Sequence, residues 1–180
     1  MAPSVDTGID LAGPSHADEL AALAAETFPL ACPPTVTRHD VRDFIGQHLT
    51  SERFTEYLAD PDRTLLLARD GGAAVAYAML VHAPPADPAI ARLVTAMPSS
   101  EISKFYAAPA AHGTGSAGLL MDRVLAVCGD RGDAGTWLGV NQQNVRAQKF
   151  YRKHGFGVAG TKTFIVGGDV HDDYVMTRDL

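Results

Sequence analysis

The sequence has only two cysteines, no long apolar run and no excess of basic residues. Cys32 and Cys128 lie far apart and show neither CxxC nor metal-ligand spacing, so we expect two reduced thiols and no metal site. No apolar stretch approaches the roughly 20 residues of a membrane-spanning helix, and no basic region followed by an apolar core begins the chain. These absences predict a soluble, cytoplasmic protein without a membrane partner.

The formal charge of −6 at pH 7 disfavours nucleic acid as a partner, because an acidic surface repels phosphate backbones. The same charge is compatible with a cationic substrate, although a mildly acidic surface is also ordinary for a soluble protein. With 180 residues, of which 46% are hydrophobic, the chain can bury a substantial core. We therefore expect residues 1–180 to form a single domain.

The first half of the chain predicts a strand near residues 8–12, three helices and a β-hairpin. Ser15 is expected to cap the first helix, and Pro29, Pro33 and Pro34 are expected to end it in a loop. The hairpin turns at residues 69–72 and has the most strongly marked strands in the sequence, Thr64–Ala68 and Ala74–His82. Because these strands are antiparallel neighbours, the sheet is not built from βαβ units alone.

The second half begins with residues 101–118, EISKFYAAPAAHGTGSAG, which predict a strand over Glu101–Ala107, a turn and a glycine-rich corner that opens a helix. A further strand, a helix and a C-terminal hairpin are expected at Thr136–Asn141, Gln142–His154, Thr161–Val166 and Val170–Thr177. This order of elements predicts an α+β fold with a mixed sheet.

The glycine-rich corner predicts a phosphate site, since the first N–H groups of a helix have no partners within it and carry partial positive charge. Residues 113–118 match GxGxxG, but Ala108–His112 separate these glycines from the strand, and the next strand ends in Asn141 instead of the acid that binds ribose. These departures disfavour a dinucleotide fold. No Lys-Ser/Thr follows the glycines, which excludes a P-loop.

Two blocks of sequence resemble the GNAT superfamily of N-acetyltransferases. Residues 112–117 (HGTGSA) fit the acetyl-CoA pattern Gln/Arg-x-x-Gly-x-Gly/Ala, with His112 in the first position. Residues 144–147 (NVRA) and 150–156 (FYRKHGF) are similar to the downstream block N-x-R/K-A…F-Y-x-K-x-G-F. The blocks stand in the family's order, and the resemblance extends over roughly residues 64–178.

The resemblance implies a GNAT fold: a mixed central sheet with a splayed pair of parallel strands, about four flanking helices and a C-terminal β-hairpin. It also implies that acetyl-CoA is the cosubstrate, with its pantetheine arm between the splayed strands and its pyrophosphate on the corner. The cofactor-binding residues that it implies are Phe105, Tyr106, Ala107, His112, Gly113, Thr114, Gly115, Ser116, Ala117, Gly118, Asn144 and Tyr151. His112 departs from the usual Gln or Arg, yet an imidazole can also donate to phosphate.

The reaction implied is direct attack of an amine on the thioester, in which two residues are catalytic. Glu101 is expected to take the amine proton through water, and Tyr151 to donate to the departing thiolate. Glu101 could instead be an exposed residue at the start of its strand, and Tyr151 a core residue beside Phe150. His82, at the end of the neighbouring strand, is the alternative base.

The acyl acceptor is less well indicated than the donor. Several segments resemble the PaiA-type spermidine/spermine acetyltransferases, which implies a polyamine acceptor, and Asp169, Asp172 and Asp173 could pair with its ammonium groups. The alternatives are another small-molecule amine, a peptide or protein amine, and a regulatory protein that binds acyl-CoA without transferring it. Homodimers are common in the superfamily, so a homodimer is compatible with the resemblance.

Overall fold

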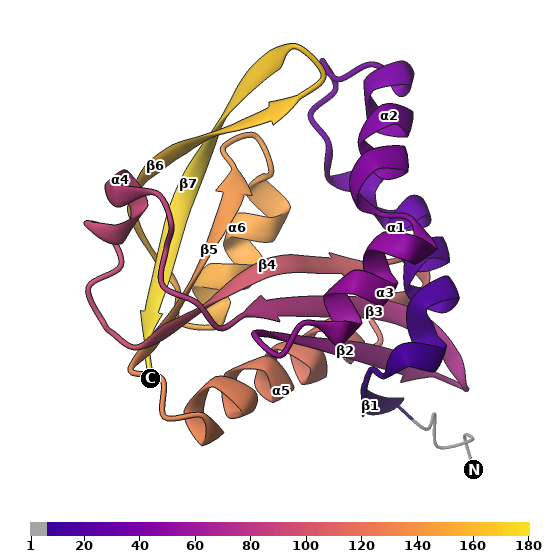
Figure 1. Ribbon diagram of the computed structural model, residues 1–180, viewed down its shortest axis with the longest axis horizontal. Coiled ribbons are helices and arrows are strands. Elements are labelled where there is room, and N and C mark those ends of the chain that lie inside the picture. The colour runs from indigo at the N-terminus through magenta and orange to yellow at the C-terminus, as the bar shows by residue number, and fades with distance from the viewer. Residues whose placement is uncertain (1–6) are drawn as a thin grey trace.

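Seven strands form one mixed sheet with the order β1-β2-β3-β4-β5-β7-β6 in a computed structural model that describes residues 7–180 (Figure 1). The sheet confirms the predicted GNAT architecture. All neighbouring strands are antiparallel except β4 and β5. The strands are β1 (Thr7–Leu11), β2 (Arg63–Asp70), β3 (Ala73–Val81), β4 (Ser99–Ala107), β5 (Gly135–Asn141), β6 (Gly157–Val166) and β7 (Asp169–Asp179).

Six α-helices lie within residues 7–180, compared with about four in the sequence-based prediction. The number four is the family's expectation, whereas the sequence patterns predicted five of these helices, including the short α3, and the remaining one, α4, has only four residues. Figure 1 shows α5 along one face of the antiparallel strands and α1 with α3 against the other. The helices are α1 (Ala17–Ala31), α2 (Arg38–His48), α3 (Ser51–Ala59), α4 (Pro88–Ala91), α5 (Ser116–Asp130) and α6 (Val145–Lys153).

The ends of α1 differ from the prediction. Ser15 does not cap this helix, because residues 14–16 form a 3-10 turn in which the N–H of Gly13 donates to Nδ1 of His16 (2.9 Å). The helix continues past Pro29 and ends at Ala31, just before Pro33 and Pro34, so only the latter two prolines lie in the loop. A proline in the last turn removes only its own N–H from the helical ladder, which the helix tolerates there.

Helix α6 begins three residues later than predicted. Gln142 is tied to the sheet instead, because its N–H donates to the carbonyl of Asp172 (3.0 Å). Asn144 then caps α6 by accepting from the N–H of Ala147 (3.1 Å). At the other end Gly155 takes φ +87°, the left-handed conformation expected after a helix.

The parallel strands β4 and β5 pair over only three residues, with Glu101 opposite Trp137 as the last pair. Beyond this point β4 continues to Ala107 and β5 to Asn141 without pairing, so the two strands separate. This is the splay that the family resemblance implies. It leaves the backbone of Ile102–Ala107 open on the side that faces β5.

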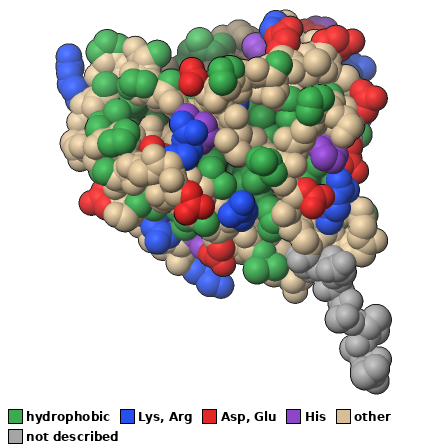
Figure 2. Space-filling model, turned by 60° about the horizontal axis from the view of Figure 1, so that its bottom comes forward, with side chains coloured by type: hydrophobic (Ala, Val, Ile, Leu, Met, Phe, Trp, Pro, Cys, Tyr) green, Lys and Arg blue, Asp and Glu red, His purple; other side chains and the backbone are tan. Residues whose placement is uncertain are grey.

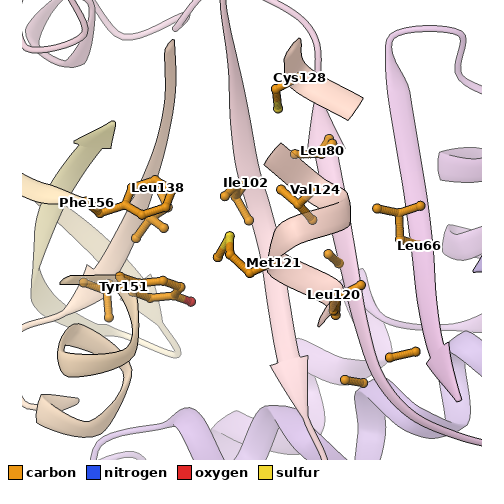
Figure 3. Close-up of a cluster of buried hydrophobic side chains, with 14 of the residues drawn as sticks. Leu66, Leu80, Ile102, Leu120, Met121, Val124, Cys128, Leu138, Tyr151 and Phe156 are labelled. Atoms are coloured by element: carbon orange, nitrogen blue, oxygen red, sulfur yellow. The ribbon is translucent and has the colours of Figure 1, made fainter. Parts of the chain in front are cut away.

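The main core lies between the sheet and helices α5 and α6. Figure 3 shows Met121 and Val124 of α5 next to Ile102 of β4, with Leu138 of β5 across the splay. A second core packs α1 and α3 against the opposite face, with Phe54 and other fully buried side chains at its centre. Figure 2, in which the bottom of Figure 1 is turned forward, shows acidic, basic and apolar side chains mixed over the surface.

Two adjacent leucines of α5 provide a test of this packing. Leu120 is 0% exposed against the sheet, whereas Leu119 is 46% exposed. Leu120→Ala should lower the free energy of unfolding by about 2–5 kcal/mol because it leaves a cavity in a close-packed core. The same substitution at Leu119 should change it by roughly 0.5 kcal/mol or less. Urea denaturation of both variants checks the difference, and equal losses would contradict the described face of α5.

Candidate active site

Two neighbouring cavities open where β4 and β5 separate. The first, which we name the charged cavity, has a volume of about 260 Å³, and its charged lining residues are Glu101, Lys104, Lys162 and Asp173. The second, the corner cavity, has a volume of about 220 Å³ and reaches His112 and Ala117 at the start of α5. The two cavities share the lining residues Ala31, Phe105, Tyr106, Asn144, Ala147 and Tyr151. A ligand could therefore extend from the corner through this shared wall toward the charged groups.

The glycine-rich corner presents free backbone donors. Gly113 and Gly115 adopt φ +77° and +83°, a left-handed conformation that residues with a Cβ rarely take. Within residues 7–180, no acceptor lies opposite the N–H groups of Gly113, Gly115, Ala117 and Gly118. Four free donors at a helix start fit a pyrophosphate, which supplies several anionic acceptor oxygens.

Thr114 and Ser116 stabilise the corner from within. The Thr114 hydroxyl donates to the carbonyl of Ala111 (2.8 Å), and the N–H of Ser116 donates to Thr114 Oγ1 (3.2 Å). The side chain of Ser116 is fully buried and lies 2.7 Å from that same oxygen. These two predicted site residues therefore shape the corner with their side chains, and the backbone of their neighbours faces outward.

A β-bulge in β4 brings Glu101 and Lys104 onto one face of the sheet. The register shifts between Met79 and Leu80 of β3, so Ser103 has no partner opposite it. Without the extra residue, side chains three positions apart would point to opposite faces. With it, Glu101 and Lys104 both line the charged cavity.

The carboxylate of Glu101 has no hydrogen-bond partner among the described residues, and its side chain is half-buried in the wall of the charged cavity. Burial raises its pKa, and this effect exceeds the opposing influence of Lys162, Lys104 and Arg63. A carboxylate with a raised pKa that faces a cavity can accept a proton more readily than an exposed one. The structure thus places Glu101 in the cavity wall, not on the outer surface.

Lys104 is a half-buried cation in the cavity wall that sequence reasoning did not identify as a site residue. Its ammonium lies 5.5 Å from the centre of the Tyr57 ring, and the guanidinium of Arg63 lies 5.0 Å from the same ring. Burial, together with Arg63, lowers the pKa of Lys104 to about 8. The sequence signal for it was a lysine within an otherwise apolar and aromatic strand, SKFYA.

Asp173 and Lys162 face each other across the β6–β7 pair, with Nζ 3.6 Å from Oδ2. The side chain of Asp173 is only 8% exposed, and its Oδ1 has no hydrogen-bond partner within residues 7–180. Burial raises the pKa of this carboxyl, and Lys162 opposes that effect. Gly139 on β5 leaves the room for Lys162, because a Cβ there would overlap Cε of the lysine.

The other predicted polyamine contacts lie elsewhere. Asp169 and Asp172 are exposed on β7, and neither lines the charged cavity. Only Asp173 of the three carboxylates reaches it. Asp172 is its neighbour along the strand and points to the opposite face, and Asp169 lies four residues away, beside the hairpin turn.

Tyr151 lies on α6 and lines both cavities. Its ring packs edge-on against Phe105 (6.2 Å between centroids) and Phe156 (6.0 Å), and Figure 3 shows its hydroxyl directed toward β4. Burial raises the pKa of the phenol, so Tyr151 remains a proton donor at neutral pH. Phe105 and Tyr151 thus face one another across the splay.

The remaining predicted site residues fall into two groups. His112 and Asn144 line the corner cavity, the latter with its side-chain oxygen already engaged in capping α6. His82 lines neither cavity. Its ring nitrogens contact Thr64 Oγ1 (2.8 Å) and Ser100 Oγ (2.7 Å), and Ser100 donates to Asp133 (2.5 Å), so His82 stabilises the base of the β4–β5 pair.

Aromatic residues from distant parts of the chain close the outer side of the charged cavity. Phe44 of α2 stacks on Phe28 of α1 (4.5 Å) and contacts Phe164 of β6 (5.8 Å). All three line the cavity. In Figure 1, α2 lies beside the tip of the β6–β7 hairpin, which agrees with this contact.

Residues 7–180 contain neither a metal-ligand cluster nor a helix suited to span a membrane. No group of three His, Cys, Asp or Glu side chains in this part of the chain is arranged to hold a metal ion. No helix in the same range has the length and apolar character needed to cross a bilayer.

Comparisons with known proteins agree with this geometry. The sequence model of the Acetyltransferase (GNAT) family matches residues 22–156. A relative from Mycobacterium tuberculosis, described as an uncharacterized N-acetyltransferase, is 49% identical over 166 residues, which cover 92% of this chain and 99% of the relative.

Two crystal structures share the fold at low sequence identity. The PaiA N-acetyltransferase from Thermoplasma acidophilum, in complex with coenzyme A, superposes with a TM-score of 0.78 at 17% identity, covering 97% of this chain and 99% of that one. A GCN5-related N-acetyltransferase from Rhodopseudomonas palustris gives a TM-score of 0.74 at 18% identity, with 100% and 99% covered. With the family match, the close relative and the splayed sheet in agreement, the chain belongs to the GNAT family of acetyltransferases.

Proposed function

We propose that this acetyltransferase moves the acetyl group of acetyl-CoA to a primary amine held in the charged cavity. The observation that carries the proposal is the junction of the two cavities at Phe105, Tyr106 and Tyr151. On one side of this junction lie free backbone donors that suit a pyrophosphate, and on the other lies the half-buried carboxylate of Glu101, which suits an amine. The thioester carbon would sit between them.

The corner would hold acetyl-CoA through the N–H groups of Gly113, Gly115, Ala117 and Gly118. His112 and Asn144 would add side-chain contacts from either side of the corner cavity. The open backbone of Phe105–Ala107 would pair with the amides of the pantetheine arm, since the splay leaves it without a strand partner toward β5. Acetyl-CoA supplies the activated acyl group, and the protein orients it toward the acceptor.

Glu101 would act as the base. An alkyl ammonium with a pKa near 10.4 is only about 0.04% neutral at pH 7, so the attacking amine must lose a proton in the site. The raised pKa of Glu101 brings its proton affinity closer to that of the amine. Tyr151 would donate a hydrogen bond to the departing thiolate, because its phenol stays protonated at neutral pH.

A polyamine acceptor is a narrower form of the proposal. Glu101 and Asp173 in the cavity wall support it, because both carboxylates could face ammonium groups. Lys104 and Lys162 in the same wall weigh against a ligand with several positive charges. A homodimer and a cytoplasmic location also remain predictions from the sequence.

Glu101→Gln should lower kcat about 10²–10⁴-fold, the range for loss of a general base. The base must be deprotonated, so the activity of the native enzyme should fall as pH drops through the raised pKa of Glu101, and the variant should lack this acidic limb. Release of free CoA, measured against pH, checks both effects. Glu52→Gln, on the exposed side of α3, is the matched control and should behave as the native enzyme. A variant at Glu101 with native kcat and pH profile would remove this residue from the mechanism.

Tyr151→Phe should lower kcat by about 10–100-fold, less than the loss of a full oxyanion-hole donor. The KM for acetyl-CoA should change little, because the ring and its packing against Phe105 are kept. Steady-state kinetics with saturating amine would measure both parameters. Unchanged turnover in this variant would show that Tyr151 serves packing alone.

Gly115→Ala should weaken CoA binding about fivefold or more. A residue with a Cβ in the left-handed region costs about 1–2 kcal/mol, so the backbone of the corner would shift and its N–H donors would leave the positions that suit the pyrophosphate. The matched control is Gly132→Ala, because Gly132 lies beyond the other end of α5, has φ +82° and has open space where a Cβ would be added. Both variants should lose similar thermal stability, and only Gly115→Ala should raise the Kd for CoA in calorimetry. Equal Kd values for the two variants would count against the corner as the phosphate site.

A further inference from the structure

We propose that the acceptor amine also carries a carboxylate, which binds at Lys104 while the amine faces Glu101 and Asp173. This rests on the proposed acetyl transfer and names the class of acceptor for the same site. The acceptor would thus be a small amino acid or a molecule of the same charge pattern.

The first argument is that Lys104 is an unsatisfied cation in the cavity wall. Its ammonium forms no hydrogen bond or ion pair with any residue of 7–180, and it lies 5.5 Å from the centre of the Tyr57 ring. Arg63 beside the same ring adds positive charge, although Asp60 pairs with Arg63 (2.9 Å). A half-buried cation in a cavity wall without a hydrogen-bonded counter-ion is unfavourable, so a ligand carboxylate at this position would gain a charged partner.

The second argument is the balance of charge in the cavity. Its wall carries two carboxylates, Glu101 and Asp173, and two ammonium groups, Lys104 and Lys162. Lys162 already contacts Asp173, and Oδ1 of that aspartate remains without a partner. A zwitterion has an ammonium group for the carboxylates and a carboxylate for the lysine, so its binding leaves the net charge of the cavity unchanged. A polyamine would add several uncompensated positive charges.

The third argument is size. The volume of the charged cavity, about 260 Å³, lies just below the range of roughly 300–1,000 Å³ that is typical of small-molecule sites. Phe44 and Phe164, which are in contact, form an apolar wall of this cavity together with Phe28 and Leu49. The space suits a small acceptor with an apolar side chain better than a folded protein surface.

The test compares acceptors that differ only in the carboxylate. Purified enzyme and acetyl-CoA are incubated with the proteinogenic α-amino acids, β-alanine and 4-aminobutyrate, and with the methyl ester and the decarboxylated amine of each. Spermidine and spermine are included, and free CoA release gives kcat/KM. The preferred amino acid should exceed its ester and its decarboxylated amine by about tenfold or more, since both analogues leave Lys104 without an anion. The ester amine is the less basic one, so a preference for the acid cannot come from easier deprotonation.

Variants locate the effect at Lys104. Lys104→Gln should lower kcat/KM for the amino acid about tenfold or more while changing that for the ester less than about twofold. Lys104→Arg should restore part of the loss because it keeps the charge. Lys149→Gln, on the exposed face of α6, is the matched control and should leave both substrates unchanged. Calorimetric binding of the amino acid to the enzyme with CoA should show the same loss in Lys104→Gln, independently of turnover.

The possible failures are distinguishable. If no amine releases CoA although CoA binds, the proposed acetyl transfer itself is wrong and this inference falls with it. If amines are acetylated but esters, decarboxylated amines or spermidine react as well as the amino acids, the acetyl transfer stands and the carboxylate-bearing acceptor is overturned. A preference for the acid that survives in Lys104→Gln would also overturn the assignment to Lys104.

Discussion

The brief pairing of β4 with β5 is the constraint on which the rest of the structure depends. Three residue pairs hold the strands together, and the contacts of His82 and Ser100 stabilise this base. Beyond Glu101 the sheet no longer satisfies the backbone of β4 toward β5, and unpaired backbone groups in an enclosed place need a partner. The sheet is therefore interrupted between β4 and β5, and two cavities that meet at Tyr151 lie beside this interruption.

Local sequence patterns predicted most of the elements, because hairpin turns, alternating apolar residues and the glycine corner are signals carried by neighbouring residues. The hairpin of β2 and β3 and the glycine-rich turn that opens α5 are confirmed as structural elements. The predicted ends of α1 and α6 were wrong, because a turn at residues 14–16 and the bond of Gln142 to β7 decide them. Such competing contacts depend on the tertiary fold.

The acceptor side of the site was harder to foresee than the donor side. The corner lies within one continuous stretch, whereas the charged cavity combines β4, β5, β6 and β7 with residues of α1 and α2. Lys104 shares a face with Glu101 only because of the bulge opposite Met79 and Leu80, which no spacing rule reveals. Lys162 and Phe164 lie on β6, which begins at Gly157, four residues before the predicted start at Thr161.

Gly139 has a consequence for how acceptor preference could change during evolution. The amine of Lys162 occupies space that a side chain at position 139 would fill. A larger residue there would push Lys162 away and leave Asp173 without its cation, so the wall would become net acidic. One substitution on a strand that bears none of the four charges could thus convert a site balanced for zwitterions into one that prefers cations.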